Sequence, residues 1–153
     1  MSEQYTHILL ATDLHTDNSA VIAKALSLSE QYKAKLSVIY VLESLPLYFS
    51  NDMVSPVIPD TQALEAQLFK LAQEKMSQLA ERYGIDPANC HLELGVAKSL
   101  IAEFAQENAV DMIVIGSHSR HGLASLLGST ARAVLNAASC DVLAVKVSPE
   151  SKS

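Results

Sequence analysis

Residues 111–147 read DMIVIGSHSRHGLASLLGSTARAVLNAASCDVLAVKV, and this stretch decides the fold. It begins with a short apolar run, Asp111 to Ile115, and ends with a second β-rich run, Asp141 to Val147. Between them lie a polar loop that contains glycine and a helix-like segment, Ser129 to Ala138. A strand, a helix and a second strand in this order are typical of two parallel strands joined by a right-handed crossover. The stretch therefore predicts an α/β protein built on a parallel sheet.

The rest of the chain repeats this alternation of strand and helix. The strands are nearly continuous apolar runs, which is the pattern of strands that helices cover on both faces. Glu43 to Pro59 holds three prolines and is expected to be irregular, either a lid over a ligand or a surface loop. The other expected strands are His7–Thr12, Leu36–Leu42 and Cys90–Leu94, and the other expected helices run from about Asp17 to Lys33, from about Asp60 to Tyr83 and from Ser99 to Asn108.

Composition narrows the class of protein. The chain has 153 residues, 49% of them hydrophobic, which fits one domain over residues 3–148 with an aliphatic core. The net charge of −6 and the lack of a basic cluster argue against nonspecific binding to nucleic acid or to an anionic membrane. The polar start of the chain lacks the build of a signal peptide, and no apolar run is long enough to span a bilayer. We therefore expect a soluble, cytoplasmic protein.

A ligand site is expected where the strand order of the sheet reverses. In open parallel sheets, ligands bind beyond the carboxyl ends of the strands at that point. If the first strand is central, the loops Ala11–Asp13 and Gly116–Ser119 bound the crevice. Asp13 directly follows an apolar strand, where it can hold a ribose hydroxyl pair or, equally, cap a turn.

The end of the second loop has the features of an anion site. Gly128 precedes Ser129 and Thr130 at the expected start of a helix. Glycine lets the backbone approach an anion, and a helix N-terminus offers unpaired N–H groups and a favourable dipole. The two hydroxyls can bind phosphate or act as ordinary N-caps. The loop is neither a Walker A motif nor GxGxxG, so by itself it is a weak signal.

These residues carry a resemblance to the universal stress protein family. HILLATDL near the start, VIYVLE in the second strand and the whole stretch of residues 111–147 are similar to it, over Thr6 to Val147. The resemblance implies an open five-stranded parallel sheet of order 3-2-1-4-5 with helices on both faces, a Rossmann-like α/β fold. It also implies a homodimer paired through the last strand, Asp141 to Val147. The family divides into an ATP-binding branch and a branch that lacks the phosphate loop.

The phosphate loop of the ATP-binding branch has the pattern of a glycine, two residues, a glycine, about nine residues, and then glycine with serine or threonine. Gly116 matches the first glycine, and Gly128 with Ser129 matches the last pair. Ser119 stands where the second glycine is expected, and eight residues separate it from Gly128. The retained terminal glycine favours the branch that binds ATP.

The resemblance also implies which residues contact the nucleotide. Asp13 would hold the ribose, while Thr12 and Val41 would contact adenine largely through backbone groups. The implied ligand is ATP or AMP, with or without Mg²⁺. Arg120 is expected either to contact phosphate or to face solvent. The full predicted set is Ala11, Thr12, Asp13, Val41, Ile115, Gly116, Ser117, His118, Ser119, Arg120, Gly128, Ser129 and Thr130.

Enzymatic chemistry has weaker support. His118 and His121 lack a third metal ligand nearby in sequence, which disfavours a zinc site. Asp13, Ser117 and His118 form no hydrolytic triad, because no G-x-S-x-G elbow is present. The chain also lacks a Walker lysine, so any ATP hydrolysis should be slow. A regulatory nucleotide-binding protein is therefore the leading hypothesis. Its alternatives are a relative that acts only through dimerisation and protein partners, and a slow ATP hydrolase.

Overall fold

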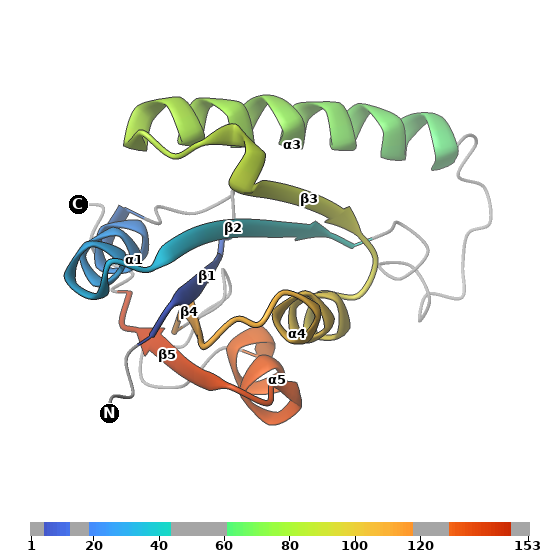
Figure 1. Cartoon of the computed structure of the whole chain (residues 1–153). Helices are drawn as coiled ribbons and strands as arrows, with labels where there is room; N and C mark the ends of the chain where they lie inside the picture. Colours follow the sequence, from blue (N-terminus) through green and yellow to red (C-terminus); the bar gives the residue numbers. More distant parts are fainter. Residues whose placement is uncertain (1–4, 13–18, 44–60, 118–128, 148–153) are drawn as a thin grey trace.

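The computed structural model describes residues 5–12, 19–43, 61–117 and 129–147 (Figure 1). Several predictions therefore lie outside the described residues. They are the ribose contact of Asp13, the lid between Glu43 and Pro59, and the loop contacts of His118, Ser119, Arg120 and Gly128.

Five parallel strands form one sheet in the order β3-β2-β1-β4-β5, which confirms the predicted α/β class and strand order. β1 is central and pairs with β2 through Leu10 and Val38 and with β4 through Leu10 and Val114. The register joins neighbouring strands over nearly their whole length, so their carboxyl ends lie along one edge of the sheet. The strands are β1 (His7–Ala11), β2 (Lys35–Leu42), β3 (Cys90–Leu94), β4 (Met112–Gly116) and β5 (Asp141–Val145).

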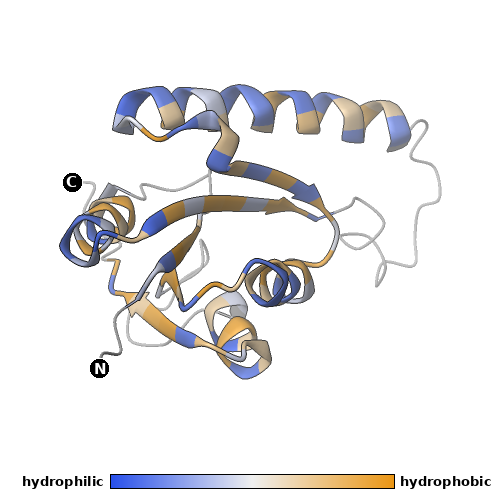
Figure 2. Cartoon of the chain, in the orientation of Figure 1, coloured by the Kyte–Doolittle hydropathy of each residue, from blue (hydrophilic) through white to orange (hydrophobic). Residues whose placement is uncertain are grey.

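The helices cover both faces of this sheet, in three layers. One hydrophobic core joins α1 and α3 to one face, and a second core joins α4 and α5 to the other. In Figure 2 the hydrophobic colours concentrate on the strands, while α3 and α4 carry hydrophilic residues along much of their length. The bounds are α1 (Ser19–Tyr32), α3 (Thr61–Tyr83), α4 (Ala97–Glu107) and α5 (Ser129–Ala137), with a short 3-10 helix η1 (Pro87–Asn89) before β3.

The central strand shows why its sequence is apolar throughout. Ile8 and Leu10 pack in the α1/α3 core, whereas Leu9 and Ala11 pack in the α4/α5 core. Successive side chains of a strand point to opposite faces, so a strand covered on both sides needs apolar residues at every position. All of β1 is buried as a result.

Helix α3 buries only some of its apolar residues. Leu64 and Leu71 are 40% and 47% exposed. The buried positions are Ala72, Met76 and Ala80, which recur every fourth residue and so lie along one line of the helix.

The amino ends of the strands are joined by hydrogen bonds. The Asp111 carboxylate accepts from the backbone N–H and the hydroxyl of Thr6, at 2.7 and 2.8 Å, and from the backbone N–H of His7 at 3.0 Å. These hydrogen bonds, that of the Thr6 N–H first, hold the pKa of Asp111 below its usual value. The buried His7 ring bonds the Asn108 carbonyl oxygen through Nδ1 and the Ser37 hydroxyl through Nε2. This edge therefore has a structural role.

Candidate functional site

The position at which the sequence predicts a ligand crevice corresponds to the carboxyl ends of β1 and β4. From β1 the chain first proceeds to β2 and β3 on one side, and only later to β4 and β5 on the other. The boundary between β1 and β4 is therefore the point at which the strand order reverses, where open α/β sheets bind ligands. Of the predicted contact residues, the structure describes Ala11, Thr12, Val41, Ile115, Gly116, Ser117, Ser129 and Thr130.

Thr12 follows β1 directly and lies at the centre of this edge. Its backbone N–H donates to the carbonyl oxygen of Ile39 at 3.0 Å, which extends the pairing between β1 and β2 by one residue. That N–H group is therefore engaged within the sheet. The side chain is buried, and its hydroxyl oxygen has no hydrogen-bond partner among the residues that the structure describes.

Gly116 lies beside Thr12 in the sheet. The register pairs Ala11 with Ile115, and its continuation by one residue places Thr12 next to Gly116. A Cβ atom added to Gly116 would lie 3.5 Å from side-chain atoms of Val21 and Val147, which is an ordinary contact distance. Packing among these residues therefore does not require glycine at this position.

Ser117 extends the sheet on the other side of β4. Its backbone N–H donates to the carbonyl oxygen of Val145 at 2.8 Å, and its hydroxyl oxygen accepts from the backbone N–H of Val147 at 3.2 Å. One lone pair of the hydroxyl is therefore used within the fold. The hydrogen bond between Val147 and Ser117 could not be predicted from the sequence, because it depends on the register between β4 and β5.

The apolar members of the predicted set lie on one face of the sheet. Ala11, Val41 and Ile115 belong to the α4/α5 core. Thr12 is two residues after Leu10, which packs in the α1/α3 core. Because residues two apart on a strand share a face, the Thr12 side chain is directed to the α1/α3 face, opposite to the apolar members of the predicted set. A single ligand can meet both sets only at the edge of the sheet, beyond the strand ends.

Helix α5 follows the loop in which the anion site was expected. Its described part runs from Ser129 to Ala137, and Thr130 is exposed. Because α5 leads back to the amino end of β5, its own N-terminus lies toward the carboxyl edge of the sheet. The positive end of the helix dipole is therefore on the side of the predicted crevice.

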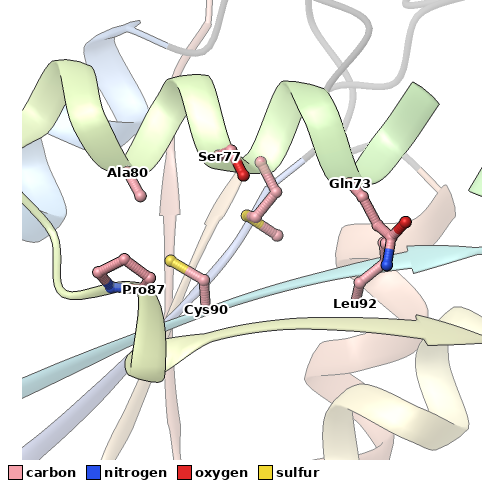
Figure 3. A pocket seen from close by; sticks show the side chains of 7 residues that line it. Gln73, Ser77, Ala80, Pro87, Cys90 and Leu92 are labelled. Atoms are coloured by element: carbon pink, nitrogen blue, oxygen red, sulfur yellow. The ribbon is translucent and has the colours of Figure 1, made fainter. Parts of the chain in front are cut away.

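A separate cavity of about 250 Å³ lies between α3, η1 and β3 (Figure 3). The Cys90 sulfur points toward α3 in this view, near Ser77 and Ala80. Burial raises the pKa of the Cys90 thiol, and the nearby Asp86 adds to the effect, so the thiol stays protonated at neutral pH and is a poor nucleophile. The remaining lining residues are Gln73, Met76, Pro87 and Leu92.

Two further properties concern the described residues alone. No group of three His, Cys, Asp or Glu side chains in this part of the chain is arranged to hold a metal ion. None of the helices that the structure describes combines the length and the apolar character needed to cross a membrane.

Comparison with known proteins shows the family and agrees with the fold. The model of the universal stress protein family matches residues 4–146. Universal stress protein A homolog 1 of Coxiella burnetii is 35% identical over 141 residues, which cover 92% of this chain and 96% of that protein. The fold is similar to that of universal stress protein UspA from Lactobacillus plantarum, with a TM-score of 0.73 at 23% identity, over 94% of this chain and 99% of that one. A universal stress protein solved in complex with cAMP has a TM-score of 0.57 at 21% identity, over 94% and 98% of the two chains.

Proposed function

Since the chain belongs to the universal stress protein family, we propose that it binds an adenine nucleotide at the carboxyl ends of β1 and β4 and acts as a stress-response regulator. The observation that carries this proposal is the pairing of two features at the point where the strand order reverses. Thr12 has a buried hydroxyl that lacks a hydrogen-bond partner within the described parts of the chain, and the adjacent Gly116 lacks a side chain although packing would admit one. Both features suit a polar ligand that approaches the strand ends closely.

We assign the remaining residues to parts of the same proposed site. Ala11, Val41 and Ile115 offer an apolar surface for a purine on the α4/α5 face. Asp13 follows Thr12 directly and would bind the ribose hydroxyls. The N-terminus of α5, with Ser129 and Thr130, would face the phosphates. Mg²⁺, where present, would be held through the phosphates, because no metal-binding group occurs among the described residues.

The identity of the nucleotide is a finer part of the proposal. We favour ATP or AMP, because Gly128 and Ser129 retain the end of the phosphate-loop pattern. The relative that was solved in complex with cAMP supports an adenine nucleotide as the ligand class. His118, Ser119 and Arg120 belong to the same loop and would lie beside the phosphates.

We also propose that two copies pair through β5 in the cytoplasm. Among the described strands, β5 pairs only with β4, so one of its edges is open. Its apolar residues Val142, Leu143 and Val145 are only half-buried. An open apolar edge strand favours aggregation, and pairing with a second copy would cover it.

Two measurements test nucleotide binding. Mass spectrometry of the purified protein is expected to detect a co-purifying adenine nucleotide. A ligand at 100 times its Kd stabilises the folded state by about 2.7 kcal/mol, which raises Tm by roughly 5–10 °C for a chain of this size. The expected order of stabilisation is ATP or AMP well above GTP, the matched control. Absence of a bound nucleotide together with an unchanged Tm in millimolar ATP would refute the proposal.

A further inference from the structure

The cavity between α3, η1 and β3 combines an apolar floor with a polar rim (Figure 3). Met76 and Ala80 are buried and Leu92 is half-buried, so these three side chains form the floor. Gln73 and Ser77 are exposed and form the rim. Small-molecule sites in proteins have this composition, an apolar lining with a few polar groups that fix the orientation of the ligand.

Small side chains on facing elements leave this space open. The four lining residues that α3 supplies lie three or four positions apart, so they share one face of the helix, over a length of about 10 Å. In Figure 3, Ala80 and Pro87 mark one end of the cavity and Gln73 and Leu92 mark the other, with Cys90 between them. An engineered apolar cavity of about 150 Å³ in another protein holds benzene, and this cavity measures about 250 Å³. It therefore has room for one aromatic ring with a small substituent.

The chemistry of the lining favours a neutral ligand. None of the described residues that line the cavity is charged, and the Cys90 thiol stays protonated because burial and the negative charge of Asp86 raise its pKa. An anion would find no cation in this lining and would be repelled by Asp86, while a cation would lose its hydration and find no carboxylate in the lining. The Gln73 amide and the Ser77 hydroxyl can each donate and accept a hydrogen bond, which suits an amide or a hydroxyl substituent.

We propose that this cavity binds a small neutral aromatic molecule that carries one amide or hydroxyl group. The ring lies on Met76 and Leu92, and the polar group is bonded by Gln73 or Ser77 at the rim. The site is separate from the proposed nucleotide crevice, because β2 lies between β3 and the pair β1 and β4 in the sheet, and the two sites share no residue.

Benzamide, benzoate and benzamidine test the class of ligand, because they share one ring and differ in charge. Each is titrated into the full chain and followed by two-dimensional proton–nitrogen NMR. Benzamide is expected to give saturable shifts at α3 and β3 with a Kd of about 0.1–1 mM, as for a single-ring fragment. Both charged probes are expected to bind at least about tenfold more weakly. Absence of saturable shifts with benzamide would overturn the proposal, and equal or tighter binding of either charged probe would contradict the neutral class.

Ser77→Leu and Gln78→Leu separate the cavity from the rest of the helix surface. Both positions are exposed on α3, but only Ser77 lines the cavity. Ser77→Leu is expected to fill the space and to weaken benzamide binding at least about tenfold, whereas Gln78→Leu is expected to keep Kd within about twofold of the wild type. Far-ultraviolet circular dichroism checks that both variants are folded. Equal affinity of the two variants for benzamide would overturn the placement of the ligand.

The two cysteines give a second measurement that needs no substitution. Cys90 and Cys140 are both half-buried, but only Cys90 lines the cavity. Benzamide at ten times its Kd is expected to slow alkylation of Cys90 by iodoacetamide about tenfold at mildly alkaline pH, because only the unoccupied cavity exposes the thiol. Peptide mass spectrometry measures both rates, and that of Cys140 is expected to stay unchanged. Equal protection of the two cysteines, or displacement of benzamide by AMP, would place the ligand elsewhere and overturn the proposal.

Discussion

Replacing Gly116 by alanine separates the needs of the fold from the needs of the ligand. The added Cβ would lie 3.5 Å from the Cγ2 atoms of Val21 and Val147, an ordinary van der Waals distance. Gly116 also ends β4 without the positive φ that side chains avoid. Neither sterics nor backbone strain in the folded protein therefore opposes Gly116→Ala.

The expected effects have opposite signs. At a position that alanine can adopt without strain, glycine-to-alanine substitution stabilises by about 0.4–1 kcal/mol, because it reduces the conformational entropy of the unfolded chain. If the nucleotide contacts the backbone at Gly116, a methyl group there weakens hydrogen bonds to a charged ligand that contribute about 1.5–3 kcal/mol. The expected loss of ATP affinity is therefore roughly 10- to 100-fold.

Urea unfolding followed by circular dichroism measures the first effect, since the chain has no tryptophan for fluorescence. Titration calorimetry with ATP measures the second. Gly95→Ala is the matched control, because Gly95 has φ +153° and its added Cβ would lie 2.9 Å from Cδ1 of Leu100. The control is expected to destabilise by about 1–3 kcal/mol and to leave ATP affinity unchanged. The reasoning is refuted if Gly116→Ala destabilises as much as the control, or if it binds ATP as tightly as wild type.

Three further predictions concern stability. Ser37→Ala is expected to lower the free energy of unfolding by about 1–3 kcal/mol, because the buried Nε2 of His7 loses its partner; urea denaturation measures this. Ala109→Gly is expected to raise Tm by a few degrees, because Ala109 has φ +55° after the end of α4, where glycine carries no Cβ penalty; an unchanged or lower Tm would contradict it. Hydrogen bonds, chiefly from the Thr6 N–H, lower the pKa of Asp111 in the folded state. The ionised Asp111 carboxylate therefore contributes its full stabilisation of the fold above the unfolded pKa of about 3.9, and this contribution is lost as pH falls through the lower pKa of the folded state. Urea midpoints from pH 6 to pH 2 should therefore fall less steeply in Asp111→Asn than in wild type.

The strands could be predicted from sequence because burial on both faces leaves a simple signal. β1 was expected at His7–Thr12 and occupies His7–Ala11, and β3 occupies Cys90–Leu94 as expected. The last strand was expected to reach Val147, but regular pairing ends at Val145, and Val147 bonds the Ser117 hydroxyl instead. The order of the strands came from the family resemblance, since composition and periodicity alone do not specify which strands are neighbours.

Helix α3 shows what hydropathy alone does not predict. Its apolar residues include Leu64, Leu71 and Met76, and their hydropathy does not say which of them are buried. In the structure Met76 is buried, whereas Leu64 and Leu71 are 40% and 47% exposed. The buried line depends on how the helix is placed against the strands, which is a property of the assembled fold.

The sequence predicts where in the fold the candidate site lies, but it does not predict which polar atoms there are already hydrogen-bonded. Topology alone brings Thr12 and Gly116 to one edge, because parallel strands end on the same side and the order reverses beside β1. Which polar groups are used within the fold depends on the register of the strands. In this register the Thr12 N–H donates to Ile39, and the Ser117 hydroxyl accepts a hydrogen bond from Val147. At the opposite edge, Asp111 accepts three hydrogen bonds and serves the fold. The buried Thr12 hydroxyl, which has no hydrogen-bond partner among the described residues, is therefore informative, because it lies at the carboxyl edge, where the proposed ligand would bind.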